Sequence, residues 1–439
     1  MRYNGGMATD VESGSVAERI APLLRALLGN TPPVRIEFWD GSIVESDGPP
    51  GSDGPPGTLR INSPDAIRRV LWMPNQLGIG RAYVAGDLDA EGDFIAMVEA
   101  LRDVTAEDLR LRSRTVIEAI AAAQRAGVIG RPLPPPPQEA RLKGRRHSLR
   151  RDSRAISHHY DVGNDFYRLV LGDSMTYSCA RFVDDSVSLD DAQAAKHDLV
   201  ARKLGLDQGE GLRLLDVGCG WGSMAIHAAS RYGVEAVGIT ISREQAELAR
   251  KRVGEAGVGD KVEIRLQDYR ELGDERFDAI SSIGMAEHVG AKRIDEYFGI
   301  LHKALEPTGR LLNHAISSVG GSKLARHSFV GRYVFPDGEL LDVGDTVRAM
   351  ERAGFEVRDL ESLREHYAKT LRAWVANLEA NWDAAVAASD IAHARIWRLY
   401  MAGSAVGFTD GGINIHQVLG VVPTASGESA IPRTRATWV

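Results

Sequence analysis

The sequence is poor in cysteine and has no long hydrophobic run. Only Cys179 and Cys219 are present among 439 residues, which excludes a disulfide framework and is typical of a reducing compartment. No apolar run approaches the ~18 residues that a membrane-spanning helix needs. The first ~30 residues lack the continuous apolar stretch of a signal peptide. We therefore expect a cytoplasmic protein whose translation starts at Met1 or Met7.

The sequence also lacks a strong excess of charge of one sign. Its 53 Lys and Arg and 60 Asp and Glu give a net charge of -7, which argues against bulk binding of nucleic acid. This average hides the segment 141–154, which contains seven Arg and Lys residues and one acid, Asp152. The segment therefore carries a charge of +6 and the rest of the chain -13. The segment is either a solvated linker or a patch attracted to anionic lipid headgroups. It has no interleaved aromatic residues on which bases would stack.

Composition divides the chain into four parts. We expect a flexible tail at 1–14, a small α/β domain at 15–130, a linker at 131–154 and a larger domain at 155–439. The linker begins with Pro132–Pro137, a run that contains too much proline for a helix and favours an extended spacer. Two domains are also expected from length alone, because the chain exceeds what one hydrophobic core usually supports.

Short apolar runs alternate with helical patterns through the larger domain. We expect strands at Arg213–Val217, Ala236–Thr240, Val262–Leu266, Ala279–Ser282 and Arg310–His314, and helices at Ser242–Ala256 and Arg293–Ala304. This alternation is typical of a doubly wound parallel sheet. In the smaller domain, Val34–Phe38 alternates like a strand and Met97–Ala126 has helical periodicity.

A glycine-rich turn follows the first strand of the larger domain. The segment Leu214–Gly222 has glycines at 218, 220 and 222, which allow the backbone to approach a ligand closely, and Asp216 precedes them. This spacing differs from the Gly-x-Gly-x-x-Gly pattern of dinucleotide sites, which is followed by an acid ~20 residues later. An acid in the turn suits a positively charged cofactor without phosphate, such as S-adenosylmethionine. The alternative is a purely structural turn.

Two residues after the third strand support the same interpretation. Tyr269 is placed to stack on an adenine ring, and Asp268 to accept hydrogen bonds from the cofactor. An Asp-Tyr pair after a strand is common, so this signal depends on its register with the glycine turn.

Several polar residues lie in otherwise apolar surroundings. They are Cys179, Glu287, His314 and Tyr367. Glu287 and His314 follow or end predicted strands, and ligands collect at the carboxyl ends of the strands in a doubly wound sheet. Each residue alone has an ordinary scaffold interpretation, and a Cys/His/Glu set also occurs in zinc sites and cysteine proteases. No Cys-x-x-Cys pair is present, so we expect no structural zinc site.

Five segments together resemble the cyclopropane-fatty-acyl-phospholipid synthase family, which includes the mycolic acid cyclopropane synthases and actinobacterial enzymes that add a methylene branch to oleoyl chains. The segments are His159–Asn164, Tyr177–Ala180, Leu215–Gly222, Glu287–Gly290 and Arg332–Gly338. The resemblance covers residues 155–423, and Leu77–Leu88 resembles the extra N-terminal domain of the phospholipid-acting members.

The resemblance implies a fold and a set of site residues. The fold is a Rossmann-like class I methyltransferase, with a doubly wound, mainly parallel seven-stranded sheet and a smaller N-terminal α/β domain that associates with lipid. The residues expected to bind S-adenosylmethionine are Tyr160, Tyr177, Ser178, Asp216, Gly218, Gly220, Thr240, Gln245, Asp268 and Tyr269. Those expected to hold a catalytic bicarbonate ion are Cys179, Glu287, His314, Ile316 (through its backbone) and Tyr367. No metal is expected.

The resemblance also implies a reaction at the cis double bond of unsaturated phospholipid acyl chains. Methyl transfer gives a carbocation, and bicarbonate or an equivalent base removes a proton to close a cyclopropane ring. Loss of another proton would give a 10-methylene chain. A small-molecule C-methyltransferase and a non-catalytic lipid- or cofactor-binding protein stay open as alternatives. The implied setting is the inner face of an anionic membrane, with peripheral association and a homodimer, the state common in the family.

Three residues depart from the family pattern. Arg181 and Ala286 stand where relatives commonly have aromatic residues, and Ser404 stands where many have cysteine. A covalent cysteine mechanism at position 404 is therefore excluded. The smaller side chain at Ala286 is expected to reshape the acyl pocket, which leaves the product type open.

Overall fold

The computed structural model describes residues 14–28, 32–49, 52–107, 124, 130–140, 162–209, 211–321 and 328–438. The chain forms two compact units, Met1–Pro137 and Gln138–Val439. The basic segment 141–154 and Tyr160 lie outside the described residues. The lipid association predicted for the smaller domain is not tested by the structure and stays a prediction.

The N-terminal unit is a four-stranded sheet with helices, in the strand order β2-β1-β3-β4. Its strands are β1 (Arg35–Phe38), β2 (Ile43–Val44), β3 (Gly57–Ile61) and β4 (Leu88–Gly92), and its described helices are α1 (Val16–Leu28), α2 (Pro64–Trp72), α3 (Gln76–Ala85) and α4 (Phe94–Glu107). The strand predicted at Val34–Phe38 is confirmed as β1. The helix predicted from Met97 is present as α4, and most of the predicted range beyond Glu107 lies outside the described residues.

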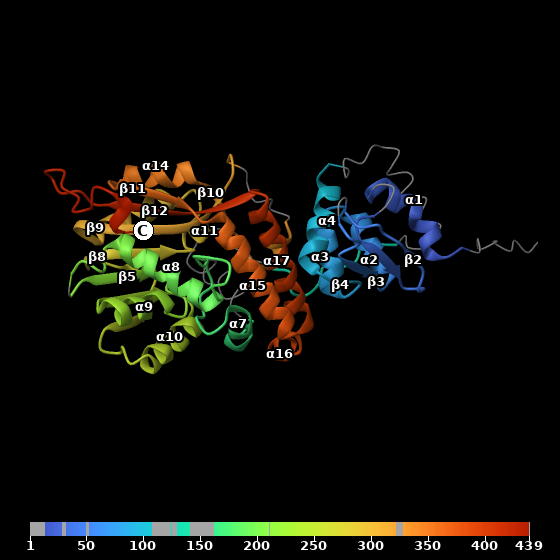
Figure 1. The fold of residues 1–439 in the computed structure, drawn as a ribbon, viewed down its shortest axis with the longest axis horizontal. Coiled ribbons are helices and arrows are strands. Elements are labelled where there is room, and N and C mark those ends of the chain that lie inside the picture. The colour runs from blue at the N-terminus through green and yellow to red at the C-terminus, as the bar shows by residue number, and fades with distance from the viewer. Residues whose placement is uncertain are drawn as a thin grey trace, which may run out of the picture. The chain divides into compact units, whose positions relative to one another are not determined.

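The C-terminal unit is built on a mixed, mainly parallel sheet (Figure 1). The strand order is β11-β12-β9-β8-β5-β6-β7, with short β10 paired to β9. The strands are β5 (Arg213–Val217), β6 (Glu235–Thr240), β7 (Val262–Leu266), β8 (Phe277–Ile283), β9 (Leu305–Ser318), β10 (Leu341–Asp342), β11 (Glu356–Ser362) and β12 (Ile413–Val421). Among the described strands of this sheet, β12 alone runs antiparallel to its neighbours, β9 and β11. The predicted doubly wound sheet of seven strands is confirmed, with β10 as a further strand.

Helices precede, connect and follow these strands. They are α7 (Asn164–Leu171), α8 (Leu189–Leu204), α9 (Ser223–Tyr232), α10 (Arg243–Glu255), α11 (Ala286–Val289), α12 (Ile294–Lys303), α13 (Phe329–Tyr333), α14 (Val343–Ala353), α15 (Arg364–Ala380), α16 (Trp382–Ala388) and α17 (Ile391–Thr409), with 3-10 turns η1 (Tyr269–Glu271) and η2 (Arg435–Thr437). The helices predicted at Ser242–Ala256 and Arg293–Ala304 are α10 and α12.

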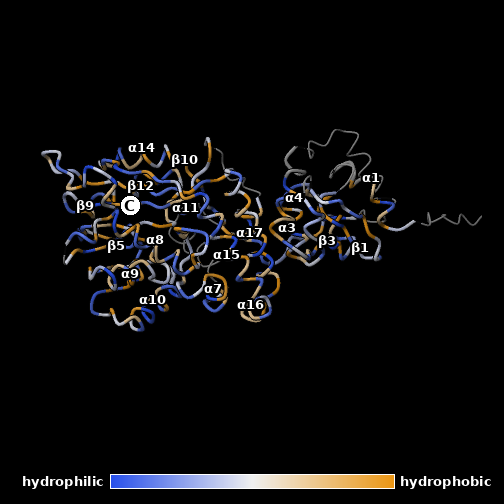
Figure 2. Tube along the Cα trace, in the orientation of Figure 1, coloured by the Kyte–Doolittle hydropathy of each residue, from blue (hydrophilic) through white to orange (hydrophobic). Residues whose placement is uncertain are grey.

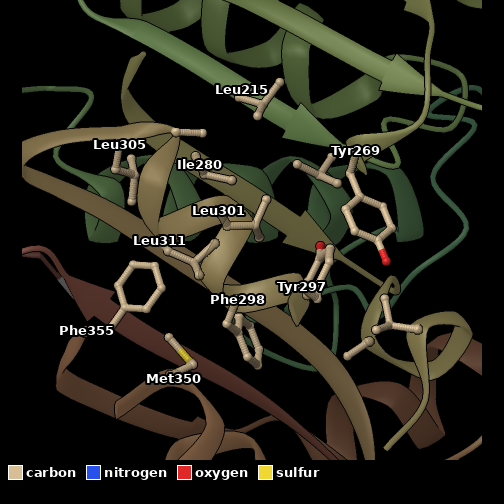
Figure 3. Packing of buried hydrophobic residues seen from close by; sticks show 14 of the residues in the cluster. Leu215, Tyr269, Ile280, Tyr297, Phe298, Leu301, Leu305, Leu311, Met350 and Phe355 are labelled. Atoms are coloured by element: carbon tan, nitrogen blue, oxygen red, sulfur yellow. The ribbon is translucent and has the colours of Figure 1, made fainter. Parts of the chain in front are cut away.

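Two hydrophobic clusters cover the two faces of this sheet. Successive side chains of a strand point to opposite faces. Accordingly, Leu214 on β5 packs with residues of α8, α9 and α10, whereas Leu215 packs with residues of α11, α12 and α14. Figure 3 shows the second cluster, in which Leu301 of α12 lies close to Leu311 of β9. Helices on both faces leave the strand ends as the place for a ligand.

A group of helices, α15 to α17 together with α7, packs beside the sheet. Hydrophobic and hydrophilic residues are interspersed along α15 and α17 (Figure 2). None of the helices in the described part of the chain is long and apolar enough to cross a membrane.

Candidate active site

A cavity of about 280 Å³ lies at the carboxyl ends of the parallel strands. From β5 the chain proceeds to β6 and β7 on one side, and then to β8 and β9 on the other. Such a switch point leaves a crevice for ligands. Thirteen predicted site residues line the cavity: Tyr177, Ser178, Asp216, Gly218, Gly220, Thr240, Gln245, Asp268, Tyr269, Glu287, His314, Ile316 and Tyr367. The structure therefore brings both predicted sets together.

The glycine turn after β5 forms one wall of the cavity. Gly218 and Gly220 have positive φ angles of 72° and 54°, a backbone conformation that favours glycine. A Cβ atom at Gly218 would collide with Met285, whereas a Cβ at Gly220 would have no neighbouring atom within 4 Å. The turn therefore needs glycine at position 218 for packing, while the backbone at position 220 is open to close approach.

Asp216 is a buried acid below this turn. Its Oδ1 accepts a 2.6 Å hydrogen bond from Ser281 Oγ, and the side chain lines the cavity. Burial raises the pKa of Asp216 to about 6. A cationic ligand would favour the ionised form, so the position suits the positively charged cofactor inferred from the sequence.

Thr240 and Gln245 form a pair at the end of β6. Thr240 Oγ1 donates a 2.9 Å hydrogen bond to Gln245 Oε1, and both residues are buried. At the end of β7, both oxygens of Asp268 accept hydrogen bonds of 2.7 Å from Arg270. Asp268 thus holds Arg270 over the Tyr269 ring, at 5.2 Å from its centroid, an arrangement that the sequence interpretation did not anticipate.

Glu287 is held at only one of its carboxylate oxygens. Its Oε1 accepts a 2.7 Å hydrogen bond from the backbone N–H of Ile316. The other oxygen, Oε2, is buried and has no hydrogen-bond partner within the described ranges. Burial raises the pKa of Glu287 to about 7. The backbone of Ile316 was expected to contact bicarbonate; its N–H orients Glu287, and the contact with bicarbonate stays a prediction.

The His314 ring resembles the Glu287 carboxylate in that only one of its two nitrogens has a hydrogen-bond partner among the described residues. Its side chain is buried, and Nδ1 lies 3.1 Å from Gln417 Nε2. Nε2 is buried without a partner in the part of the chain that the structure describes. Burial and the nearby Lys196 and Lys203 hold the pKa of His314 well below its usual range. The imidazole is therefore neutral at physiological pH.

Aromatic side chains surround the remaining site residues. Tyr367 packs against Phe408, with ring centroids 4.7 Å apart. The Tyr177 hydroxyl donates a 3.2 Å hydrogen bond to the hydroxyl of Tyr400, and the Tyr177 ring lies 5.4 Å from that of Trp374. An aromatic enclosure of this kind excludes water and presents ring faces that attract cations.

Cys179 differs from the other predicted residues. It is fully buried but does not belong to the cavity lining. Its thiol contacts the carbonyl oxygens of Ala180 at 3.1 Å and Leu363 at 3.6 Å. Burial raises the pKa of this thiol, which keeps it protonated and poorly nucleophilic. Ser404, the serine that replaces the family's cysteine, does line the cavity.

The sequence interpretation missed two polar residues of α8, Gln193 and Lys196. Gln193 Nε2 donates to the carbonyl oxygen of Ser178 at 2.8 Å, and Lys196 Nζ donates to Ser178 Oγ at 2.9 Å. Lys196 also lines the cavity, and burial lowers its pKa to about 7. Their spacing of three residues on one face of a helix was the available signal, but it does not show that this face is buried.

Comparison with known proteins decides the family. A family profile described as "Mycolic acid cyclopropane synthetase" matches residues 147–418. This chain belongs to the cyclopropane synthase family. Members of this family are S-adenosylmethionine-dependent methyltransferases, so the chain is an enzyme of that class.

Two relatives cover most of this chain. "Probable fatty acid methyltransferase Rv3720" of Mycobacterium tuberculosis is 41% identical over 417 residues, which cover 92% of this chain and 95% of the relative. "Cyclopropane-fatty-acyl-phospholipid synthase" of Escherichia coli is 32% identical over 368 residues, covering 82% of this chain and 87% of the relative.

A solved cyclopropane synthase also has the same fold. The crystal structure of mycolic acid cyclopropane synthase CmaA1 complexed with SAH and CTAB matches with a TM-score of 0.58 and 34% identity. The match covers 61% of this chain and 98% of that chain. The class I methyltransferase fold and the family resemblance are thus confirmed. The role of each individual site residue stays a prediction.

Proposed function

We propose that this chain methylates the cis double bond of unsaturated acyl chains in phospholipids and yields cyclopropane fatty acyl chains. One observation carries the proposal. Glu287 Oε2 and His314 Nε2 are buried without a partner among the described residues, and both residues line the cavity that contains the glycine turn. Leaving a buried polar atom unpaired costs about 1–3 kcal/mol. Both atoms are therefore available to a small ligand or a reacting group.

The cofactor position follows from the residues at the strand ends. S-adenosylmethionine, when bound, supplies the methyl group from its sulfonium. The open backbone at Gly220 would lie against it, and Asp216 would offset part of its positive charge. Tyr269 would stack on its adenine ring. These residues fit the cofactor through charge and close approach.

Apolar residues on the remaining walls suit an acyl chain. Leu371, Tyr400, Phe408, Ile413 and Ile415 all line the cavity. By excluding water, they would protect a carbocation on the acyl chain from capture as an alcohol. Aromatic faces would stabilise the positive charge. The acyl substrate rests on this chemistry and on the names of the relatives, a probable fatty acid methyltransferase and a cyclopropane-fatty-acyl-phospholipid synthase.

We propose that Glu287 and His314 hold a bicarbonate ion as the base. The neutral His314 would donate a hydrogen bond through Nε2–H. Because burial raises the pKa of Glu287 to about 7, its Oε2 can carry a proton and donate as well. Two donors fit a small oxyanion, which would accept a proton from the newly added methyl group as the ring closes. An ionised Glu287 that accepts the proton directly is the equivalent base.

Two further features belong to this proposal. Loss of a different proton would give the methylene product. Ala286, which was expected from the sequence to lie at the acyl pocket, packs in the hydrophobic core and does not line the cavity, so it does not explain this choice. The basic segment 141–154 would bring the enzyme to the anionic inner face of a membrane as a peripheral protein, in a homodimer as is common in the family.

The direct test incubates the full-length protein with methyl-labelled S-adenosylmethionine and vesicles that contain oleoyl phospholipid. We expect label in the lipid fraction. An absence of label there would overturn the proposal. A soluble substrate that outcompetes the vesicles would favour a small-molecule C-methyltransferase instead.

A further inference from the structure

Three polar side chains lie in one row across three neighbouring strands. In the sheet register, Glu361 of β11 pairs with Gln417 of β12, and Gln417 pairs with His314 of β9. Figure 1 shows these strands side by side. Directly paired residues place their side chains on the same face of a sheet. The row therefore links the edge of the sheet to the imidazole in the cavity.

Lys203 of α8 reaches this row from the helix that covers it. Its side chain is 1% exposed, and its Nζ donates a 2.9 Å hydrogen bond to Gln417 Oε1. Lys203 also forms ion pairs with Asp359, at 3.0 Å, and with Glu361. These two acids compensate the buried ammonium and fix its position.

The direction of each hydrogen bond follows from the chemistry of these groups. An ammonium can only donate, so the Gln417 amide must turn its oxygen toward Lys203. Its NH₂ group then faces His314 Nδ1, 3.1 Å away. Since an amide NH₂ can only donate, Nδ1 must accept. A neutral imidazole carries one hydrogen, which therefore lies on Nε2, the buried atom without a partner among the described residues.

We propose that Lys203 and Gln417 are positioning residues that fix the tautomer of His314, so that Nε2–H is presented to the cavity as a donor. Neither residue lines the cavity, so both act through the imidazole. The tautomer itself is independent of the substrate. Its catalytic consequence rests on the proposed function, in which Nε2–H holds the base.

The first test is nuclear magnetic resonance of the full-length protein with ¹⁵N-labelled histidine, with the His314→Gln spectrum to assign the ring. In the wild type we expect the unprotonated nitrogen to be Nδ1. In Gln417→Glu an ionised carboxylate offers only acceptors, so the hydrogen should move to Nδ1 or the ring should become doubly protonated. An unprotonated Nε2 in the wild type, or an unchanged tautomer in Gln417→Glu, would overturn the inference.

The second test measures steady-state kinetics. We expect Gln417→Glu to lower kcat about tenfold or more while KM for S-adenosylmethionine changes less than about threefold. Gln417→Met, which removes the donor without adding charge, should also lower kcat. In the resonance measurement, Lys203→Met should give a mixture of tautomers. Lys251→Met, on the exposed face of α10, is the matched control and should change neither the tautomer nor kcat. Wild-type kcat in both Gln417 variants would overturn the inference.

The two tests separate this inference from the proposed function. If the wild type makes no lipid product but has the expected tautomer, the proposed function fails and the inference stands. If lipid is methylated while the tautomer does not respond to Gln417→Glu, the inference fails and the proposed function stands. Melting curves of each variant show whether it is folded.

Discussion

The backbone N–H of Ile316 donates a 2.7 Å hydrogen bond to Glu287 Oε1. This bond joins β9 to the short helix α11, and the other carboxylate atom, Oε2, has no hydrogen-bond partner among the residues that the structure describes. Glu287, on α11 shortly after the end of β8, is thus held in a fixed orientation. A fixed orientation is what a proton-transfer site requires.

Glu287→Gln should abolish most turnover and preserve cofactor binding. The amide oxygen can still accept from Ile316 and its NH₂ can still donate to the bound ion, but the amide can neither take up nor release the proton that the ion receives from the substrate. We expect kcat to fall at least about a hundredfold, with the dissociation constant of S-adenosylmethionine within about threefold by titration calorimetry. Glu296→Gln, at an exposed position of α12, is the matched control. Near-normal turnover of Glu287→Gln would refute its role.

Glu287 should also make stability depend on pH. Burial raises its pKa from the ordinary 4.5 to about 7, so the folded protein binds this proton more tightly than the unfolded chain. The resulting stabilisation is fully present below about pH 4.5 and is lost as pH rises through about 7. The neutral Glu287→Gln has no such loss.

We therefore expect the difference in the free energy of unfolding, variant minus wild type, to increase from pH 5 to pH 8 by up to about 3 kcal/mol. Thermal melts of the two proteins across this range measure it, and the other titrating groups largely cancel in the difference. A difference that stays constant with pH would show that the pKa of Glu287 is not raised.

Cys179→Ser should retain turnover. The thiol is fully buried, contacts two carbonyl oxygens, and does not line the cavity. A serine hydroxyl can donate to the same carbonyls. We expect at least about a tenth of wild-type kcat, and no inactivation of the native enzyme by iodoacetamide at this position. A loss as large as that of Glu287→Gln would place Cys179 in the chemistry.

Removal of bicarbonate should slow the reaction. If Glu287 and His314 hold this ion, turnover in carbon dioxide-depleted buffer should fall several-fold and recover when bicarbonate is added. Glu287→Gln should not recover. Turnover that is independent of bicarbonate would identify Glu287 itself as the base.

Neutralising the arginines from Arg145 to Arg154 should weaken binding to anionic vesicles. Each basic residue near such a surface contributes about 1 kcal/mol, and salt screens the attraction. Co-sedimentation should therefore show the largest difference from the wild type at low ionic strength. Equal binding of the two proteins would mean that the segment is a solvated linker.

Sequence reasoning located the fold and most of the cavity because both depend on local patterns. The strand predicted at Arg213–Val217 coincides with β5, and the glycine turn after it needs positive φ angles that the residue type reveals. Residues at strand ends, such as Glu287 and His314, meet at one edge because the topology is parallel.

The missed residues depend on contacts between distant segments. Gln417 lies 103 residues from His314 along the chain, and nothing local shows that β12 inserts between β9 and β11. From the sequence alone, Lys203 is expected to be a solvent-exposed basic residue in the last turn of a helix. Only the packed sheet turns it into a buried ammonium that faces Gln417. Similarly, the bidentate hold of Asp268 on Arg270 was not predicted, because either side chain alone is equally suited to solvent.

Mass spectrometry of the product phospholipids tests the central claim most directly. After incubation with S-adenosylmethionine and oleoyl phospholipid vesicles, we predict an acyl chain that is heavier by one CH₂ and resistant to ozonolysis, as a cyclopropane is. The product should be absent with Glu287→Gln. A chain of the same mass that ozonolysis cleaves would instead identify a methylene branch. An unchanged acyl chain would contradict the account.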